Sequence, residues 1–499
     1  MSKTPGTEAE PLLLLNGTSA GGLDTSAYLN AELGEFATSL FASYNRSDAY
    51  DPADIGLSAI PEFERWTFNP RLFRETPRST LTLGLNAVVE DRLGGDMQFI
   101  DGKILSIPDA LPTSLAYTEN SETTRLATQL DYKRQLEAGR ELVLRNSVSR
   151  FSRDLTVPGF SFSGTQVSSF SELHISGQNS TSDWVVGANL WTEDFDDEAN
   201  QSRFSQDFSD HTLGAFVQGT LDLKELWSLE AGLRLDTTSD FGNFFLPRFS
   251  LLHRFSPATD IRVGGGLGYK SPTVFTEEAE RLQFQNILPL ELGSLQAEES
   301  VGLNFDINHR IEFAQDLGLN VNFLMFYTRV DDPLRLVQDD QGLFRYQQPI
   351  DYLDTQGVEF NSVLNWQFYK LFLGYTYTNV NEHRANSSKA AVLVPEDRLN
   401  AVLVYELEDS FRIGLESYYY GSQKLSDGSR SRDYWIVGLM MEKALSNGSS
   451  VFLNFENFSD TRQTRYGPIY SGSLSDPQFM DIYAPLDGFV INGGFKIRF

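Results

Sequence analysis

The carboxy-terminal segment, Asp487 to Phe499, constrains the fold more than any other part of the sequence. Every second residue of DGFVINGGFKIRF is apolar or glycine, and the residues between are small, polar or charged. Because a β-strand turns successive side chains to opposite faces, this alternation predicts a strand with one apolar and one polar face. The apolar face consists of Phe489, Ile491, Gly493, Phe495, Ile497 and Phe499.

Similar alternation recurs along almost the whole chain, most clearly in residues 261–269 and 317–327. The pattern predicts an all-β fold of twenty-two antiparallel strands, an even number, as in single-chain bacterial transmembrane β-barrels. The predicted strands are 12–20, 22–33, 35–47, 64–74, 79–91, 117–136, 140–157, 160–178, 181–195, 210–224, 227–239, 244–256, 259–271, 298–312, 317–331, 351–366, 368–382, 397–408, 411–424, 432–445, 449–461 and 488–499.

The connections between these strands alternate between tight and long. Tight turns include 33–35, 76–78, 137–139, 256–259 and 446–448. Long connections cover 48–63, 92–116, 196–209, 272–297, 332–350, 383–396 and 462–487. Short periplasmic turns at one rim and long extracellular loops at the other are typical of an outer-membrane barrel. A propeller would repeat a blade motif every 40–45 residues or so, and no such motif recurs.

Composition fits a barrel and excludes several other classes. The longest aliphatic run, Leu12 to Leu15, is far shorter than the roughly 20 apolar residues of a spanning helix, whereas a barrel strand needs only about 9–11 residues. The absence of cysteine excludes disulfides and thiolate metal sites. A net charge of -28 argues against nucleic acid as a partner. Aromatic residues near strand ends, including Trp66, Trp191 and Trp435, predict interfacial girdles.

The segment from Arg262 to Pro272, RVGGGLGYKSP, resembles the glycine-rich strand and following turn of TonB-dependent outer-membrane receptors. Further pieces follow in the order and at the spacing of that family, and the resemblance to its barrel covers nearly the whole chain. They are LQAEES at 295–300, QGVEF at 356–360, PEDRLN at 395–400, NFENFSD at 454–460 and the final Phe499.

The resemblance also predicts the domain organisation. In that family a signal peptide, a short TonB-contacting box and a plug domain precede the barrel. Here residues 1–10 are polar, and Leu12 already begins the first predicted strand. We therefore expect a disordered stub over residues 1–11 and a transmembrane β-barrel over residues 12–499, with plug, box and signal absent. A truncated form, an incomplete gene and a plugless variant all remain open.

The function implied by the resemblance is active uptake of a scarce, bulky ligand, most often a ferric siderophore, otherwise cobalamin. It implies insertion in the outer membrane beside lipid and lipopolysaccharide, assembly by the barrel-assembly machinery with Phe499 as the terminal signal, and coupling to TonB. No cofactor and no enzymatic activity are expected. Two alternative hypotheses are that the protein is a passive outer-membrane channel without a plug, or a soluble all-β binding protein.

Ligand contacts in such a receptor are expected from aromatic and arginine side chains on the outer loops. The segment 276–285, TEEAERLQFQ, has acidic residues in its first turn and predicts a short helix in the seventh outer loop. The candidate ligand-binding residues are Arg281, Phe284, Tyr346, Arg384, Tyr466 and Tyr470.

Two other motifs favour structural interpretations. Gly17 to Gly21 matches the G-x-S-x-G pattern of hydrolases, but that motif requires a following helix, and residues 23–33 alternate like a strand. A hairpin loop is therefore predicted. The acidic residues between Glu193 and Asp210 could hold a cation such as Ca²⁺, although they lack the glycine of an EF-hand loop. Solvated loop charge is the favoured interpretation.

Overall fold

The computed structural model describes residues 11–102, 116–198, 204–408, 410–445 and 448–499. Of the stub predicted over residues 1–11, residues 1–10 lie outside the described part. Within the described ranges, helices are short, and none has the length and apolar character needed to cross a bilayer.

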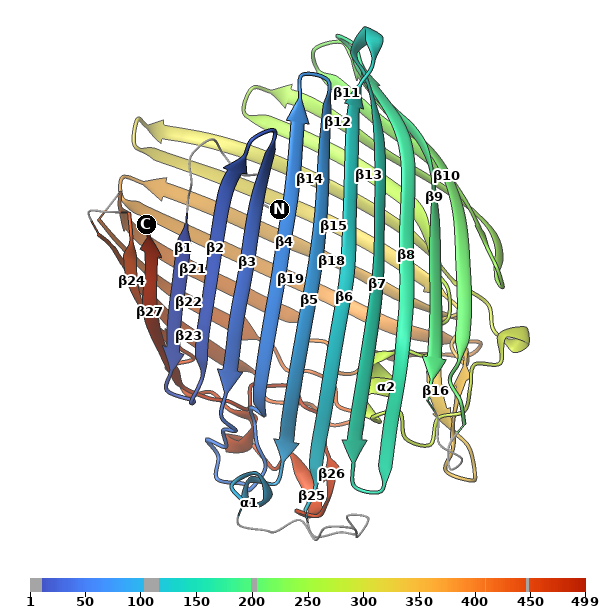
Figure 1. Ribbon diagram of the computed structural model, residues 1–499, viewed down its shortest axis with the longest axis vertical. Helices are drawn as coiled ribbons and strands as arrows, with labels where there is room; N and C mark the ends of the chain where they lie inside the picture. Colours follow the sequence, from blue (N-terminus) through green and yellow to red (C-terminus); the bar gives the residue numbers. More distant parts are fainter. Residues whose placement is uncertain (1–10, 103–115, 199–203, 409, 446–447) are drawn as a thin grey trace.

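Twenty-two strands form the wall of one closed antiparallel barrel, which confirms the predicted fold (Figure 1). Each predicted strand is present, with ends shifted by a few residues. The strands are β1 (Leu12–Thr18), β2 (Leu23–Leu33), β3 (Phe36–Ser47), β4 (Glu62–Thr76), β5 (Ser79–Gly95), β6 (Thr118–Gln135), β7 (Arg140–Val157), β8 (Phe160–Gln178), β9 (Ser182–Asp197), β10 (Phe208–Leu223), β11 (Trp227–Thr238), β12 (Gly242–Ser256), β13 (Thr259–Lys270), β14 (Glu298–Ala314), β15 (Leu317–Asp331), β18 (Tyr352–Trp366), β19 (Tyr369–Arg384), β21 (Asp397–Leu407), β22 (Phe411–Tyr420), β23 (Tyr434–Ala444), β24 (Ser450–Glu456) and β27 (Val490–Arg498).

The first and last strands close the barrel. β1 pairs with β27 antiparallel, from Leu12 opposite Arg498 to Thr18 opposite Asn492. Closure pairs the backbone groups that an open sheet would leave exposed at its edges. Gly494 lies in this seam, where an added Cβ would overlap the carbonyl oxygen of Leu15. The seam therefore depends on a residue without a side chain.

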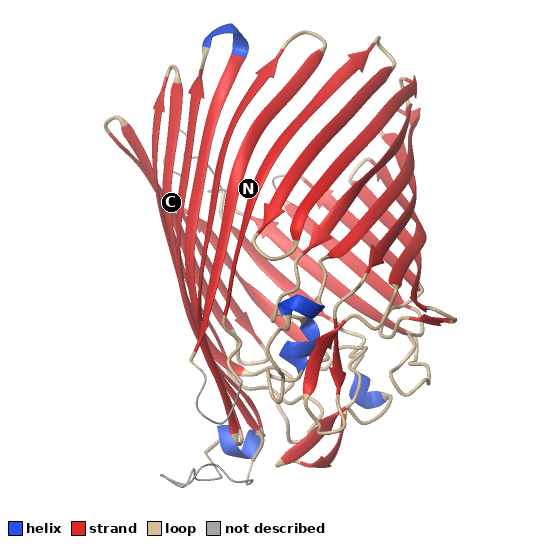
Figure 2. Ribbon diagram, turned by 90° about the vertical axis from the view of Figure 1, so that its right-hand side faces the viewer, coloured by secondary structure: helices blue, strands red, loops and turns tan. Residues whose placement is uncertain are grey.

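Every connection at one rim is a tight turn. All of the long loops lie at the other rim, together with the short connections 19–22, 158–159 and 239–241 (Figures 1 and 2). Each turn joins a pair such as β6 and β7, where Ala138 adopts a positive φ of 59° within the short 3-10 helix η1 (Glu137–Gly139). The connection after β1 is a hairpin, as predicted for Gly17 to Gly21. We number the loops at the second rim from 1 to 11 in chain order, and we call the opening that they surround the mouth.

The long loops contain several short helices and strands. Helix α1 (Met97–Ile100) lies in loop 3, and helix α2 (Glu277–Arg281) lies in loop 7 with the 3-10 helix η2 (Leu292–Ser294), which confirms the helix predicted there. Loop 11 contains the 3-10 helix η3 (Gln463–Arg465). Short strands form further hairpins: β16 (Arg335–Gln338) with β17 (Phe344–Gln347) in loop 8, β20 (Ser387–Ala390) beside β19, and β25 (Tyr470–Ser473) with β26 (Asp476–Phe479) in loop 11.

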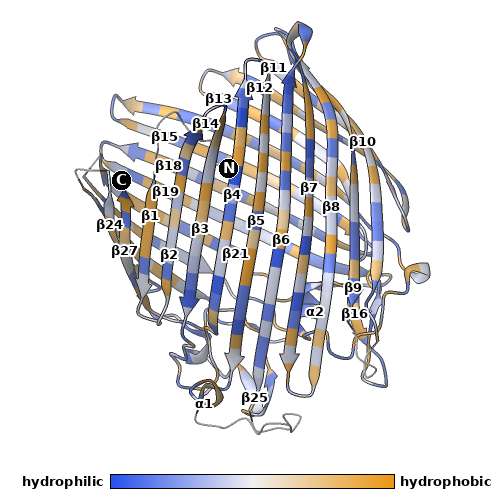
Figure 3. Ribbon diagram, viewed as in Figure 1, coloured by the Kyte–Doolittle hydropathy of each residue, from blue (hydrophilic) through white to orange (hydrophobic). Residues whose placement is uncertain are grey.

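The two faces of the wall differ in chemistry, as the alternating bands in Figure 3 show. On the outer face Leu251, Val263 and Phe305 are register neighbours across β12, β13 and β14. On the inner face a row of amides crosses β14, β15 and β18 through Asn308, Asn322 and Asn361. An apolar exterior around a polar interior is the reverse of a soluble protein and is the arrangement of a transmembrane barrel.

One aromatic prediction is corrected by the register. Trp66 and Trp435 are 60% and 46% exposed on the outer face, as expected for girdle residues. Trp191 instead lies opposite Phe170 and Thr212, and it shares the inner face of β9 with Glu193. The alternation of β9 places its even-numbered residues outside, so Trp191 faces the barrel interior. Proximity to a strand end does not determine on which face of the barrel wall a side chain lies.

Candidate binding site at the barrel mouth

Loops 7 and 8 (residues 271–297 and 332–351) fold inward and pack against the wall. They share backbone hydrogen bonds, since Leu288 donates to the Phe344 oxygen at 2.9 Å and Phe344 donates to the Asn286 oxygen at 2.8 Å. Their buried side chains join those of three strands in a single hydrophobic group, here called the mouth cluster. Its members are Leu155, Phe162, Phe195, Val274, Ala279, Phe284, Ile287, Leu295, Leu334 and Tyr346.

Helix α2 is positioned by its own end groups. The Thr276 hydroxyl accepts a hydrogen bond from the Ala279 nitrogen at 3.1 Å, which caps the first turn. Glutamates in that turn suit the positive end of the helix dipole, and the fully buried Ala279 faces the cluster. After the helix, Gln283, Phe284 and Asn286 adopt positive φ values of 53°, 60° and 57°. Such backbone is costly for residues other than glycine, so packing of the loop must hold it.

Phe284 is the central contact between loop 7 and the wall. Its ring stacks on Phe162 of β8 with a centroid distance of 4.2 Å and an interplanar angle of 13°. Only 4% of Phe284 and 2% of Phe162 are exposed. Burial of two such rings stabilises the folded loop by a few kcal/mol, on the order of 2–3 kcal/mol per ring. This contact offsets the strained backbone on either side of it.

Ion pairs surround the mouth cluster. Arg153 of β7 donates to both carboxylate oxygens of Glu280, at 3.0 and 2.9 Å. Arg335 lies 3.3 Å from Glu382 and 3.8 Å from Glu278, so it links loop 8 to β19 and to α2. Because these side chains are partly exposed, each pair contributes roughly 0–1 kcal/mol. The pairs fix the orientation of the loops more than they stabilise them.

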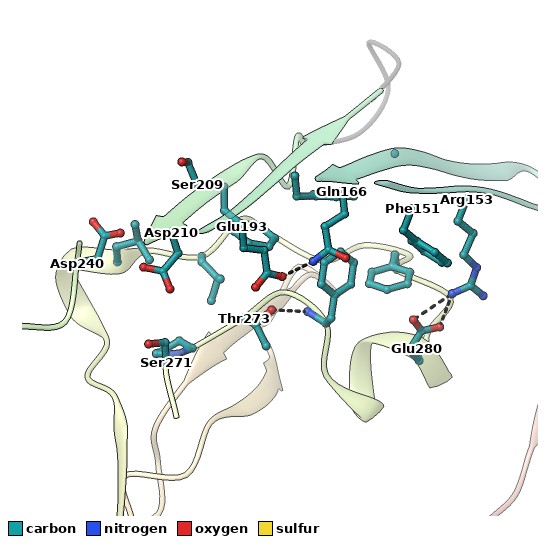
Figure 4. A pocket seen from close by; sticks show the side chains of 18 of the residues that line it. Phe151, Arg153, Gln166, Glu193, Ser209, Asp210, Asp240, Ser271, Thr273 and Glu280 are labelled. Carbon is teal, nitrogen blue, oxygen red and sulfur yellow. Dashed lines mark hydrogen bonds and ion pairs between the residues drawn. The ribbon is translucent and has the colours of Figure 1, made fainter. Parts of the chain in front are cut away.

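Between loop 7 and the inner wall lies a cavity of about 540 Å³ (Figure 4). Aromatic rings from the wall and the loop form much of its lining, and carboxylates occupy the rest. Gly164 permits close packing there, because an added Cβ would collide with the ring of Phe195. The lining includes Phe151, Arg153, Phe162, Gln166, Glu193, Phe195, Phe208, Asp210, Asp240, Phe241, Ser271, Thr273, Phe275, Glu280 and Phe284.

The polar groups of the cavity are predominantly acidic. The Oε1 atom of Glu193 accepts a hydrogen bond from the Gln166 amide. The Ser239 hydroxyl lies 2.6 Å from Asp210 and 2.9 Å from Asp240, and so holds these two carboxylates near each other. Arg153 lines the same cavity, but its guanidinium is engaged by Glu280. The described side chains contain no group of three or more potential ligands arranged around a metal position.

The predicted ligand-binding residues fall in different places. Phe284 lines the cavity, and Tyr346 lies deeper in the mouth cluster, where its hydroxyl donates to the Val274 oxygen at 2.8 Å. Burial raises the pKa of Tyr346, so the phenol stays protonated and can donate at physiological pH. Arg281 and Arg384 are exposed, at the ends of α2 and β19.

The two predicted tyrosines of loop 11 lie in a separate part of the mouth. The Tyr470 hydroxyl donates to the Ile55 oxygen of loop 2 at 3.1 Å, and the Arg432 guanidinium lies 5.9 Å from the centre of the Tyr466 ring. The structure therefore brings Phe284 and Tyr346 together but does not join them to Tyr466 and Tyr470. A ligand-binding role for these residues stays a prediction.

Sequence reasoning did not select Arg153, Gln166 or Asp240 as site residues. It weighed Glu193 and Asp210 as ligands of a cation such as Ca²⁺ and favoured solvated loop charge. Arg153, Gln166, Glu193 and Asp210 share one sequence signal: each is a polar residue at an inner-face position near the loop end of a strand. Asp240 lies instead in the turn between β11 and β12. That signal becomes visible once the register of the neighbouring strands is known.

The family model of the TonB dependent receptor-like β-barrel matches residues 20–458. The chain belongs to this family. Its members are receptors rather than enzymes. A curated relative, the iron-regulated outer membrane virulence protein of Vibrio cholerae, is 22% identical over 308 residues. That match covers 57% of this chain and 44% of the relative.

Solved structures with the same fold cover nearly the whole chain. The iron transporter FrpB of Neisseria meningitidis has a TM-score of 0.75 at 12% identity, covering 99% of this chain and 82% of that one. A ferric enterobactin receptor mutant of Pseudomonas aeruginosa, in complex with enterobactin, has a TM-score of 0.74 at 15% identity and coverage of 100% and 82%. The ferric-catecholate import receptor Fiu of E. coli has a TM-score of 0.73 at 12% identity and coverage of 100% and 83%.

Proposed function

We propose that this TonB-dependent receptor barrel serves the uptake of a ferric siderophore across the bacterial outer membrane. The observation that carries the proposal is the cavity between loop 7 and the inner wall. Its volume of about 540 Å³ lies within the range of roughly 300–1,000 Å³ that small-molecule sites occupy. The relatives named above as iron or siderophore receptors support iron as the cargo.

In this proposal the apolar outer face contacts lipid and, at the loop rim, lipopolysaccharide. The last strand acts as the signal for the barrel-assembly machinery, and the 77% exposed ring of Phe499 would be available to it. Because the outer membrane has no nucleotide supply, the energy for uptake must be supplied from the periplasmic side, through TonB and a plug. Loops 7 and 8 would capture the ligand at the mouth before it passes to the interior.

Binding of a ferric siderophore is expected to quench the fluorescence of Trp191. The Trp191 indole nitrogen lies 3.5 Å from a carboxylate oxygen of Glu193, which lines the cavity. A coloured iron complex seated there would accept excitation energy from this indole. The measurement is a titration of the chain, folded in detergent, with ferric hydroxamate and ferric catecholate complexes.

We expect saturable quenching by at least one complex and loss of that quenching in Trp191→Phe. The iron-free ligands serve as a control. No saturable quenching by any complex, together with a large steady conductance in planar bilayers, would contradict the proposal and favour a passive channel.

A further inference from the structure

We propose that the cavity beneath loop 7 selects for positive charge, so that the ferric complex taken up is cationic rather than anionic. This inference rests on the proposed function and adds the charge class of the ligand. The relevant chemistry is simple. Three catecholates around Fe(III) give a trianion, three hydroxamates give a neutral complex, and a protonated amine on the hydroxamate chain makes that complex a cation.

The first support is an excess of unpaired negative charge in the cavity. Glu193, Asp210 and Asp240 all line it, and none has an ion pair with any residue that the structure describes. Arg153 is the basic residue in the described lining, and its charge is offset by Glu280. A buried anion placed among three carboxylates would be repelled, whereas a cation would reduce their mutual repulsion.

The second support is the aromatic surface that faces the same space. Phe151, Phe208, Phe241 and Phe275 line the cavity and are only partly buried, unlike the enclosed ring of Phe284. Phe275 stands nearly perpendicular to Phe195, at an interplanar angle of 81°. Aromatic ring faces carry partial negative charge and attract ammonium groups. Rings and carboxylates therefore favour the same ligand, an organic cation with apolar methylene segments.

The test compares two forms of one ligand that differ only in charge. A linear ferric tris-hydroxamate with a free terminal ammonium and its N-acetylated form are titrated into the folded chain, with a ferric tris-catecholate as the anion. Trp191 fluorescence reports binding of all three. We expect the ammonium form to bind about tenfold more tightly than the acetylated form, and the trianion to bind most weakly. Added salt should reduce the difference.

Substitutions of the cavity carboxylates test whether the cavity causes the preference for the ammonium form. Asp210→Asn combined with Asp240→Asn, and separately Glu193→Gln, should each reduce about tenfold the ratio of the affinity for the ammonium form to the affinity for the acetylated form. Asp222→Asn is the matched control, because Asp222 is an exposed residue at the opposite end of the same strand as Asp210. It should change neither affinity.

The possible failures can be told apart. Equal binding of the two hydroxamate forms, or tighter binding of the catecholate, would overturn the charge inference while leaving siderophore uptake intact. A retained preference in both cavity variants would also overturn it. Absence of binding by all three complexes would overturn this inference and the proposed function together.

Discussion

Gly494→Val is expected to prevent closure of the barrel, the largest effect that a single substitution should have in this chain. The seam between β1 and β27 brings Gly494 opposite Asn16, and a Cβ at this position would overlap the backbone of Leu15. Backbone of a paired strand cannot move aside as a flexible side chain can. The first and last strands would have to separate, at a cost of about 3 kcal/mol or more.

Migration on gels measures this closure. A folded barrel resists detergent and migrates differently before and after heating. We expect Gly494→Val to lose the heat-sensitive band. Gly302→Val is the matched control, because Gly302 is another inner-face strand glycine, and an added Cβ there meets only the Thr328 hydroxyl at 3.8 Å. If the two variants fold equally well, the seam does not depend on Gly494.

Phe284→Ala is expected to release loop 7 from the mouth without unfolding the barrel. The substitution removes the ring that stacks on Phe162 and leaves a cavity in the mouth cluster, a change that typically costs about 3–5 kcal/mol. The backbone of residues 283–286 would then relax from its positive φ values. Hydrogen exchange of loop 7 amides should accelerate strongly, while the strands remain protected.

The matched control for this prediction is Phe368→Ala. Phe368 lies in the tight turn between β18 and β19 and is 50% exposed, so its removal should cost little and leave loop 7 protected. Faster exchange confined to loop 7 in Phe284→Ala supports the packing described above. Equal protection of loop 7 in both variants would contradict it.

The wall of this barrel could be predicted from sequence because its strands are long and each face meets a different environment. In β15 the apolar residues between Leu317 and Tyr327 alternate with Gly318, Asn320 and Asn322. This period of two predicts both the strand and the face of the sheet on which each side chain lies. Helix α2 was predictable for a local reason too, since its capping threonine and first-turn glutamates are adjacent in sequence.

The site could not be predicted to the same degree, because it is made by contacts between residues distant in sequence. The stacking of Phe284 on Phe162 and the pairing of Arg153 with Glu280 join loop 7 to strands more than a hundred positions earlier. The hairpin of β16 and β17 was missed because strands of four residues are too short to show alternation. Trp191 was misplaced because proximity to a strand end does not specify a face.

The most direct test of the central claim, a cylinder closed between the first and last strands, is a disulfide across the seam. The chain has no cysteine, so Leu13→Cys with Ile497→Cys introduces a single pair at directly opposed positions of β1 and β27. Opposed residues of antiparallel strands lie about 4.5–5.5 Å apart between Cα atoms, within disulfide reach. The control pairs Leu13→Cys with Val451→Cys in β24, which is one strand further around the wall.

We predict that the seam pair oxidises efficiently in the folded, membrane-inserted chain and that the control pair does not, because its strands are not neighbours. Failure of the seam pair to oxidise in folded protein, or equal oxidation of both pairs, would contradict a closed barrel.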